Sequence, residues 1–124
     1  MAQAINWFEI PVANLDRAQA FYETMLARKL QRAEFGDGLV HAIFPHADDA
    51  SGGCLQSGNR PAAGQASGIR VYLDCAPSLD AALARAQAAG ARVLQPRTEL
   101  PGDLGCFAVI TDTEGNEVGL HALQ

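Results

Sequence analysis

A carboxylate in the first apolar stretch of the chain is the residue best placed for chemistry. Glu9 lies between Phe8 and Ile10, where apolar residues alternate with others over residues 5–12. Alternation with a period of two predicts a strand that buries one face. A carboxylate on such a strand can act as a general base or anchor a ligand. It can equally pair with a cation such as Arg70 or reach solvent, because an unpaired buried carboxylate is costly.

The side chains expected on the same face as Glu9 supply further candidates. Successive side chains of a strand point to opposite faces, so Trp7 and Glu9 face away from Phe8 and Ile10. The same reasoning applied to later strands selects a set of polar, aromatic and small residues for the Glu9 face: His41, Cys54, Gln56, Arg70, Tyr72, Asp74, Glu117, Gly119 and His121.

Each of these candidates has an expected role. Tyr72 or His121 is expected to assist acid–base chemistry at Glu9. Arg70 can clamp a carboxylate or phosphate, or can simply balance neighbouring acids. Trp7 can pack in the core or form a platform for a ligand. The remaining candidates are expected to line a binding site: His41, Cys54, Gln56, Glu117 and Gly119.

Histidines and cysteines raise the question of metal binding. His41, His121 and Glu9 can form a site of two histidines and one carboxylate, although a solvated or edge-strand histidine is the commoner case. The three cysteines are an odd number without CxxC spacing, which predicts free thiols rather than a disulfide framework or a zinc ribbon. No GxGxxG, P-loop, GxSxG or HExxH motif occurs. We therefore expect no cofactor.

The elements that must position these residues lie in a chain that repeats itself. Residues 15–31 and 79–95 align at a constant offset of 64, with eight identities in seventeen positions and no gap. An offset close to half of the 124 residues indicates two similar modules. Modules this small are marginal alone, so we expect them to share one core or to pair with a partner chain.

Each module is expected to have the order βαβββ, which makes the fold class α+β. In the first, Asn14 is expected to cap a helix over residues 15–26. In the second, Ser78 is expected to cap a helix over residues 79–89 that Gly90 ends. Strands are expected at residues 5–12, 30–35, 39–44, 53–56, 69–75, 92–96, 105–111 and 117–122.

The whole chain is expected to form a single domain over residues 1–124. Its two repeats cover about 1–57 and 68–124, and a linker rich in Gly, Ala and Ser joins them over 57–68. The net charge is −5 and the nine Lys and Arg residues form no cluster, so neither nucleic acid nor an anionic membrane is expected as a partner. No apolar run approaches the roughly 20 residues of a membrane span, and no signal-peptide pattern opens the chain. We therefore expect a cytoplasmic protein.

Three stretches carry a recurring pattern. Residues 7–18 (WFEIPVANLDRA) with Phe21 and Tyr22 give a strand, a cap and a helix ending in an aromatic pair. Residues 88–91 (AAGA) end the second helix, and FAV at 107–109 leads into the DTEGN turn. Together they resemble the vicinal oxygen chelate (VOC) superfamily, which includes glyoxalases, extradiol dioxygenases and bleomycin-resistance proteins. The resemblance spans nearly the whole chain and implies two βαβββ modules forming an incomplete barrel around a cleft.

The resemblance also locates the positions at which metal-binding members hold their ion. One ligand typically begins the first strand of each module, and these positions fall on Trp7 and on Arg70, or Val71 if the alignment shifts by one. The carboxylate position falls on Gly119 and its repeat partner on Cys54. Only Cys54 can bind a metal, and a single thiolate does not suit Mg, Mn or Ni. We therefore expect the usual metal site of the family to be absent.

The resemblance thus implies a metal-independent protein that binds a small organic molecule in the cleft. If it is an enzyme of the lyase or isomerase type, acid–base chemistry through Glu9 is expected. A non-catalytic protein that sequesters a drug or metabolite is the alternative, and the acidic chain would suit a cationic ligand. A metal-dependent lyase or dioxygenase is the least favoured interpretation. Many small members pair so that each cleft lies at an interface, and we expect a homodimer.

Overall fold

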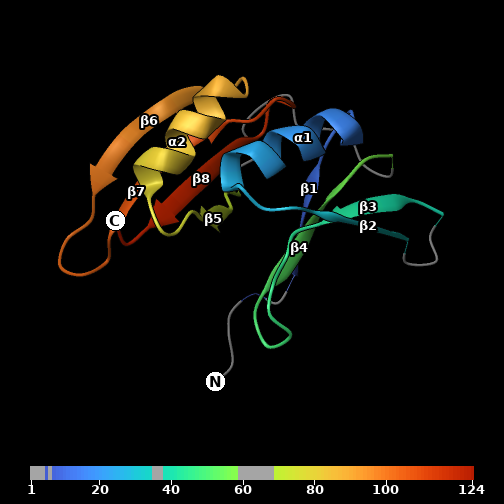
Figure 1. Cartoon of the computed structure of the whole chain (residues 1–124), viewed down its shortest axis with the longest axis horizontal. Helices are drawn as coiled ribbons and strands as arrows, with labels where there is room; N and C mark the ends of the chain where they lie inside the picture. Colours follow the sequence, from blue (N-terminus) through green and yellow to red (C-terminus); the bar gives the residue numbers. More distant parts are fainter. Residues whose placement is uncertain (1–4, 6, 35–37, 59–68) are drawn as a thin grey trace.

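The computed structural model describes residues 5, 7–34, 38–58 and 69–124, and its strands form two four-stranded sheets (Figure 1). Sheet A contains the strands of the first half of the chain: β1 (Trp7–Pro11), β2 (Gln31–Glu34), β3 (Val40–Ile43) and β4 (Gly52–Gln56). Sheet B contains those of the second half: β5 (Tyr72–Asp74), β6 (Arg92–Glu99), β7 (Cys106–Thr111) and β8 (Glu117–Ala122).

The two sheets share one topology. Their strand orders are β1-β4-β3-β2 and β5-β8-β7-β6. In each sheet the first strand pairs parallel with the last strand of the same half, and the other pairs are antiparallel. Both sheets remain open over the described residues, so neither closes into a barrel.

Two helices cover one face of the sheets, α1 (Leu15–Leu26) between β1 and β2 and α2 (Leu79–Ala88) between β5 and β6. Figure 1 shows them side by side along one side of the molecule, and Arg85 Nε joins them by donating to the carbonyl oxygen of Met25 at 2.9 Å. Neither helix is long and apolar enough to span a membrane. Large apolar or amphipathic side chains fill the space between helices and sheets: Tyr22, Met25, Leu55, Leu79, Ile110 and Leu120.

The helices begin at the capping residues predicted from the sequence. Asn14 Oδ1 accepts a hydrogen bond from the backbone N–H of Arg17, and Ser78 Oγ accepts one from the N–H of Ala81. These side chains satisfy N–H groups that have no partner within the first helical turn. α2 ends one residue earlier than predicted, and Gly90 follows with φ +111°, the left-handed conformation expected there.

The turn between β7 and β8 docks against the start of α1. Glu114 accepts two hydrogen bonds from the guanidinium of Arg17, at 2.7 and 2.9 Å, and two more from the backbone N–H groups of Ala13 and Asn14. The Arg17 hydrogen bonds lower the pKa of the Glu114 carboxyl from about 4.5 to about 2, although burial opposes the shift. This turn therefore ties the two halves of the chain together.

Two predicted strands differ from the observed ones by three residues at one end, and the other bounds differ by two residues or fewer. β5 covers only Tyr72–Asp74 of the predicted 69–75, whereas β6 runs through Pro96 to Glu99 instead of ending at 96. β6 is the edge strand of sheet B, where a proline costs no hydrogen bond to a neighbour, and its pairing with β7 is irregular around Gln95. Most of the predicted linker, residues 59–68, lies outside the described residues.

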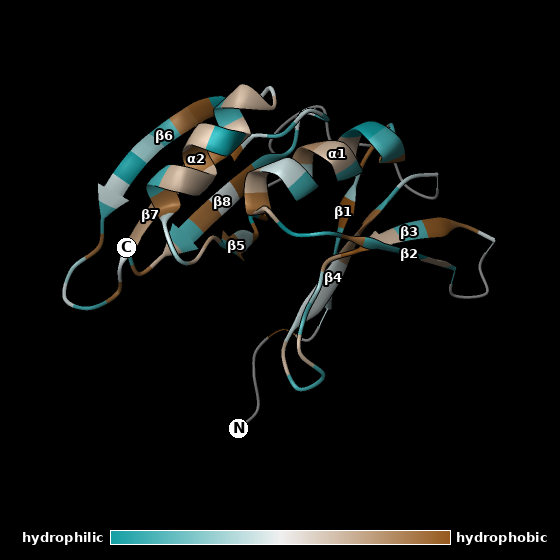
Figure 2. Cartoon of the chain, viewed as in Figure 1, coloured by the Kyte–Doolittle hydropathy of each residue, from teal (hydrophilic) through white to brown (hydrophobic). Residues whose placement is uncertain are grey.

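Figure 2 shows polar and apolar residues mixed along most strands and both helices, as expected for elements that bury one face, although all five residues of β4 are buried. In sheet A, Ile10, Ala42 and Leu55 are buried on the face that α1 covers. The other face of each sheet points away from the helices. We call these two faces the inner faces, and they contain the candidate residues.

Candidate functional site

The register of sheet A places a set of candidate residues on its inner face. Glu9 on β1 is the partner of Cys54 on β4, and His41 on β3 is the partner of Gln56 on β4. Because partnered residues point to the same side of a sheet, all four side chains share one face. The alternation in the sequence thus predicts the correct face for these residues, and their roles remain predictions.

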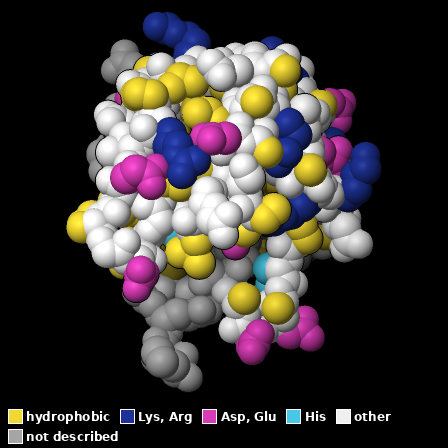
Figure 3. Space-filling view, turned by 60° about the vertical axis from the view of Figure 1, so that its left-hand side comes forward, with side chains coloured by type: hydrophobic (Ala, Val, Ile, Leu, Met, Phe, Trp, Pro, Cys, Tyr) yellow, Lys and Arg dark blue, Asp and Glu magenta, His cyan; other side chains and the backbone are white. Residues whose placement is uncertain are grey.

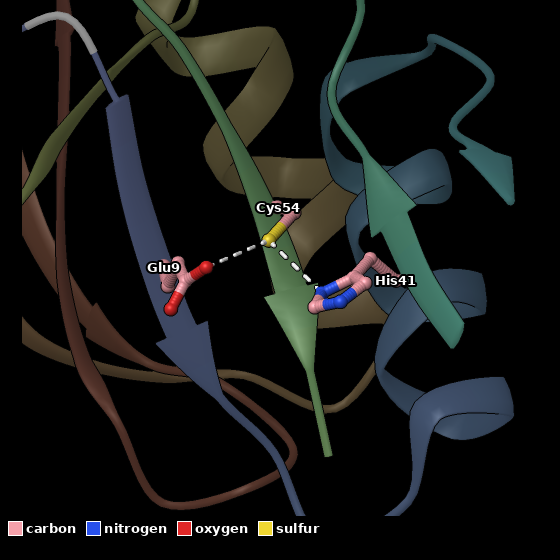
Figure 4. A group of neighbouring side chains, drawn as sticks. All are labelled: Glu9, His41 and Cys54. Carbon is pink, nitrogen blue, oxygen red and sulfur yellow. Dashed lines mark hydrogen bonds between the residues drawn. The ribbon is translucent and has the colours of Figure 1, made fainter. Parts of the chain in front are cut away.

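Three of these side chains come close together. Cys54 Sγ lies 3.7 Å from His41 Nδ1 and 4.0 Å from Glu9 Oε2. Glu9, His41 and Cys54 each offer one ligand atom within 4.8 Å of the other two. Figure 4 shows them on three neighbouring strands, with Cys54 between the other two. We call them the Glu9–His41–Cys54 group. His41 and Cys54 are buried, whereas Glu9 is half-buried.

Gln56 extends the same inner face with an unsatisfied polar atom. Its side chain is 3% exposed, and its Oε1 atom is buried without a hydrogen-bond partner among the described residues. A buried acceptor without a donor is costly and therefore uncommon in folded proteins. This atom marks a place where a donor from a bound molecule or ion would fit.

Trp7 lies at the start of β1 on the same face. Its side chain is 38% exposed, and its ring meets that of His46 edge to face at 6.1 Å between centroids. His46 is exposed, with Nδ1 2.8 Å from the carbonyl oxygen of Ala47. An indole at the position where the family begins its ligand set offers no metal donor.

The inner face of sheet B contains the remaining candidates. Arg70 forms an ion pair with Glu117 at 3.0 Å, and its guanidinium lies 3.4 Å from the hydroxyl of Tyr72. The expected pairing of Arg70 with Glu9 is not found among the described residues, because Glu117 lies next to Arg70 instead. Asp74 accepts a hydrogen bond from the N–H of Ala76.

A cavity of about 370 Å³ opens on sheet B, lined by Tyr72, Leu100, Phe107 and His121. The rings of Tyr72 and Phe107 meet nearly edge to face, with centroids 6.2 Å apart. His121 Nε2 lies 2.7 Å from the carbonyl oxygen of Leu104, and because a carbonyl only accepts, this nitrogen carries the proton and donates. The cavity therefore combines aromatic walls with one polar ring.

Gly119 has no space for a side chain. A Cβ built at this position would overlap the ring of Tyr72, its partner on β5. Nor do Trp7 and Arg70 provide metal donors, so Cys54 is the one donor at the four positions where the resemblance places ligands. The described residues therefore do not fit the usual metal site of the family.

The candidates fall into two groups on different sheets. Glu9 and His41 come together with Cys54, not with His121, which belongs to the cavity on sheet B. No strand of sheet A lies beside a strand of sheet B in the described part of the chain. Direct cooperation of Glu9 with Tyr72 or His121 within one chain thus has no geometric support.

The sequence did not predict two residues that contribute to the cavity. Leu100 lines it, and Leu104 holds His121 through its backbone carbonyl. Both lie just beyond β6, where the sequence LPGDLG over residues 100–105 lacks the alternation that assigns residues to a face. Their apolar character beside a Pro-Gly turn was the only available signal.

Positive charge does not gather on the face of the molecule that Figure 3 shows. Figure 3 shows Asp and Glu side chains interspersed with Lys and Arg over the face in view. Four further ion pairs besides that of Arg70 join described residues, and each includes an Arg. This pattern matches the absence of a basic cluster in the sequence.

Comparison with known proteins now gives a family and a fold. A model of the glyoxalase/bleomycin resistance protein/dioxygenase superfamily matches residues 4–120. A search of curated protein sequences found no relative of this chain. The structure is similar to that of TnmS3, an antibiotic-binding protein from a Streptomyces species, with a TM-score of 0.69 and 22% identity over 98% of this chain and 96% of the other.

Two other solved structures are also similar to this one in fold. UcmS2 has a TM-score of 0.68 and 22% identity, with 98% of each chain covered. A variant of glyoxalase I from Zea mays has a TM-score of 0.68 and 19% identity over 95% of this chain and 45% of that one. At such identities these likenesses show the fold alone.

Proposed function

Because the chain belongs to the glyoxalase/bleomycin resistance protein/dioxygenase superfamily, we propose that it binds a small, planar organic molecule on the inner face of sheet B. The observation that carries this proposal is the cavity of about 370 Å³ lined by Tyr72, Leu100, Phe107 and His121. Ligand sites are typically apolar hollows of this size with a few polar groups that fix orientation.

The lining of the cavity favours an aromatic ligand. Tyr72 and Phe107 offer ring edges and faces, and such pairs stabilise a stacked ring through their quadrupoles. His121 presents a polar ring within the same cavity, and Arg70 lies beside Tyr72 with its side chain 40% exposed. A ring system with one acceptor or anionic group would match the Arg70 guanidinium.

Binding without turnover is the favoured form of this proposal. TnmS3, which shares the fold, is described as an antibiotic-binding protein, and this supports the sequestration hypothesis by analogy. Acid–base chemistry through Glu9 remains the second hypothesis. It requires the ligand to reach the inner face of sheet A as well, where the unsatisfied Gln56 Oε1 supplies a polar contact.

We also propose a homodimer in which the inner faces of two chains meet, with residues 1–57 and 68–124 acting as the two repeats of one domain. Trp7 and Tyr72 are 38% and 49% exposed on these faces, more than large aromatic rings usually are. Light scattering coupled to size exclusion should give twice the chain mass of 13.1 kDa. A monomer at micromolar concentration would contradict the dimer but not the cavity.

The binding proposal is tested with anilinonaphthalene sulfonate, a fluorescent aromatic anion, followed by a panel of planar aromatic compounds. Phe107→Ala should weaken binding of the dye by about tenfold, because it removes one wall of the cavity. Val40→Ala, an exposed apolar residue on sheet A, is the matched control and should leave binding unchanged. Equal binding by wild type and Phe107→Ala would show that the cavity is not the site.

A further inference from the structure

We propose that the Glu9–His41–Cys54 group binds a zinc-class divalent ion through one sulfur, one nitrogen and one oxygen atom. This site goes beyond the small-molecule proposal, from which it is independent. It shares Cys54 with the positions at which the resemblance places the metal of the family, but Glu9 and His41 occupy none of those positions.

The spacing of the three donors fits tetrahedral coordination. Zinc binds sulfur at about 2.3 Å and nitrogen or oxygen at about 2.0–2.2 Å, which at a tetrahedral angle separates sulfur from either partner by about 3.6 Å. The observed separations from Cys54 Sγ are 3.7 Å to His41 Nδ1 and 4.0 Å to Glu9 Oε2. Every pair of donors lies within 4.8 Å. Small side-chain rotations would therefore close the site.

The donor types select zinc over other common ions. A thiolate favours soft or borderline ions such as Zn²⁺ and Cu⁺ over Mg²⁺, Mn²⁺ and Ca²⁺. An imidazole and a carboxylate complete a set that Zn²⁺ accepts in many proteins. The charges also match, because one thiolate and one carboxylate neutralise a divalent cation in a largely buried place.

The scaffold holds the donors in place from three adjacent strands. β1, β4 and β3 pair in that order, and the register fixes Glu9 opposite Cys54 and His41 diagonal to it (Figure 4). Sites built on sheet positions are more rigid than sites built on loops. The sequence suggested a metal site formed by Glu9, His41 and His121. In the site proposed here Cys54 takes the place of His121.

A water molecule is the expected fourth ligand of the zinc ion, and Gln56 would accept a hydrogen bond from it. Zinc sites with three protein ligands hold a water or a substrate atom in the fourth. Gln56 Oε1, buried on the same face and opposite His41 in register, has no donor among the described residues. A zinc-bound water would provide such a donor. Glu9 is the least buried of the three ligands.

The other two cysteines provide an internal comparison. Cys75 and Cys106 are buried like Cys54, but neither belongs to a group of three potential ligands in the described part of the chain. Burial raises the pKa of the Cys75 thiol to about 11, which keeps it protonated and unsuited to a metal. Cys75→Ala is therefore a matched control for Cys54→Ser.

The test uses the purified chain, freed of metal with a chelator and titrated with Co²⁺ as a spectroscopic substitute for Zn²⁺. Wild type and Cys75→Ala should bind one equivalent and show a thiolate-to-cobalt charge-transfer band that Zn²⁺ displaces. Cys54→Ser should lose the band. Glu9→Gln and His41→Ala should weaken Co²⁺ binding by about tenfold or more. Mutation of a residue that only hydrogen-bonds a metal ligand already lowers metal affinity by about that factor.

A second measurement needs no variant and covers the case in which Cys54→Ser does not fold. Zn²⁺ should protect the metal-free wild-type chain from unfolding by urea, because an ion that binds only the folded state stabilises it, and chelation should remove this protection. Absence of both the charge-transfer band and the protection overturns the proposal. A band that survives in folded Cys54→Ser overturns it as well. Dye binding in the cavity of sheet B would be unaffected by either result.

Discussion

The ring of Tyr72 lies across Gly119, its register partner on the neighbouring strand. Because Gly119 has no side chain, the Tyr72 ring can occupy the space above it, and this ring lines the cavity on sheet B. The position where relatives that use a metal are expected to hold a carboxylate thus contributes to an aromatic wall. The absence of a side chain at Gly119 leaves the space in which the Tyr72 ring forms part of the cavity wall.

This pairing predicts that Gly119→Ala displaces the Tyr72 ring and weakens dye binding in the cavity by about tenfold. Stability should fall by less than about 1 kcal/mol, because Tyr72 is half exposed and can rotate away. Dye titration and urea unfolding measure the two effects. In a Tyr72→Ala background the same change should have no further effect on binding, whereas additive losses would contradict the pairing.

The contact between Glu114 and Arg17 predicts a stability that depends on pH. Glu114→Gln should lower the free energy of unfolding at neutral pH by about 2 kcal/mol, because it weakens hydrogen bonds to a charged group. The folded-state pKa of Glu114 is about 2 against about 4.5 unfolded, so the carboxylate stabilises the fold above pH 4.5 and loses this effect as pH falls toward 2.

Urea unfolding of wild type and Glu114→Gln between pH 7 and pH 2 measures this difference, and the two curves should converge at the acid end. Glu99→Gln is the control, since Glu99 pairs with Arg97 while 69% exposed and should contribute less than about 1 kcal/mol. A difference that stays constant with pH would show that Glu114 acts through packing alone.

A buried hydrogen bond predicts sensitivity to alkali. Tyr22 is fully buried and donates to Asp112 Oδ2 at 2.7 Å, and burial raises its pKa well above the usual value near 10. A raised pKa stabilises the fold below the unfolded value and loses that effect as pH rises beyond it. Tyr22→Phe should cost about 1–2 kcal/mol at pH 7 and should reduce the decline in stability above pH 10.

Local features of the sequence predicted the helices and the faces of the strands. Asn14 and Ser78 mark helix starts because their side chains satisfy backbone N–H groups within three residues, which requires no knowledge of the rest of the chain. The alternation around Glu9 likewise fixes a face because side chains of a strand alternate regardless of its neighbours. Such local rules account for the α+β class and most element boundaries.

Contacts between strands were less predictable. That Cys54 meets both Glu9 and His41 depends on the order β1-β4-β3 and on a register set by the turns between strands, neither of which the alternation specifies. The strand predicted over residues 92–96 ends at Pro96, but the place of Pro96 on an edge strand allows the strand to continue to Glu99. The separation of His121 from Glu9 depends on how the two halves pack, through Arg17, Glu114 and the helices.

The separation of the two inner-face groups predicts that their ligands bind independently. Glu9→Gln should weaken Co²⁺ binding while leaving dye affinity within about twofold of wild type, because Glu9 is on sheet A and the cavity is on sheet B. Phe107→Ala should weaken dye binding and leave Co²⁺ affinity within about twofold of wild type.

If the bound molecule is also turned over with Glu9 as the base, Glu9→Gln should abolish turnover and still bind the dye. Two titrations on each of three proteins measure this, and circular dichroism confirms that the variants fold. A dimer that brings sheet A of one chain against sheet B of the other would couple the sites, so a loss of dye affinity in Glu9→Gln as large as in Phe107→Ala would contradict independence.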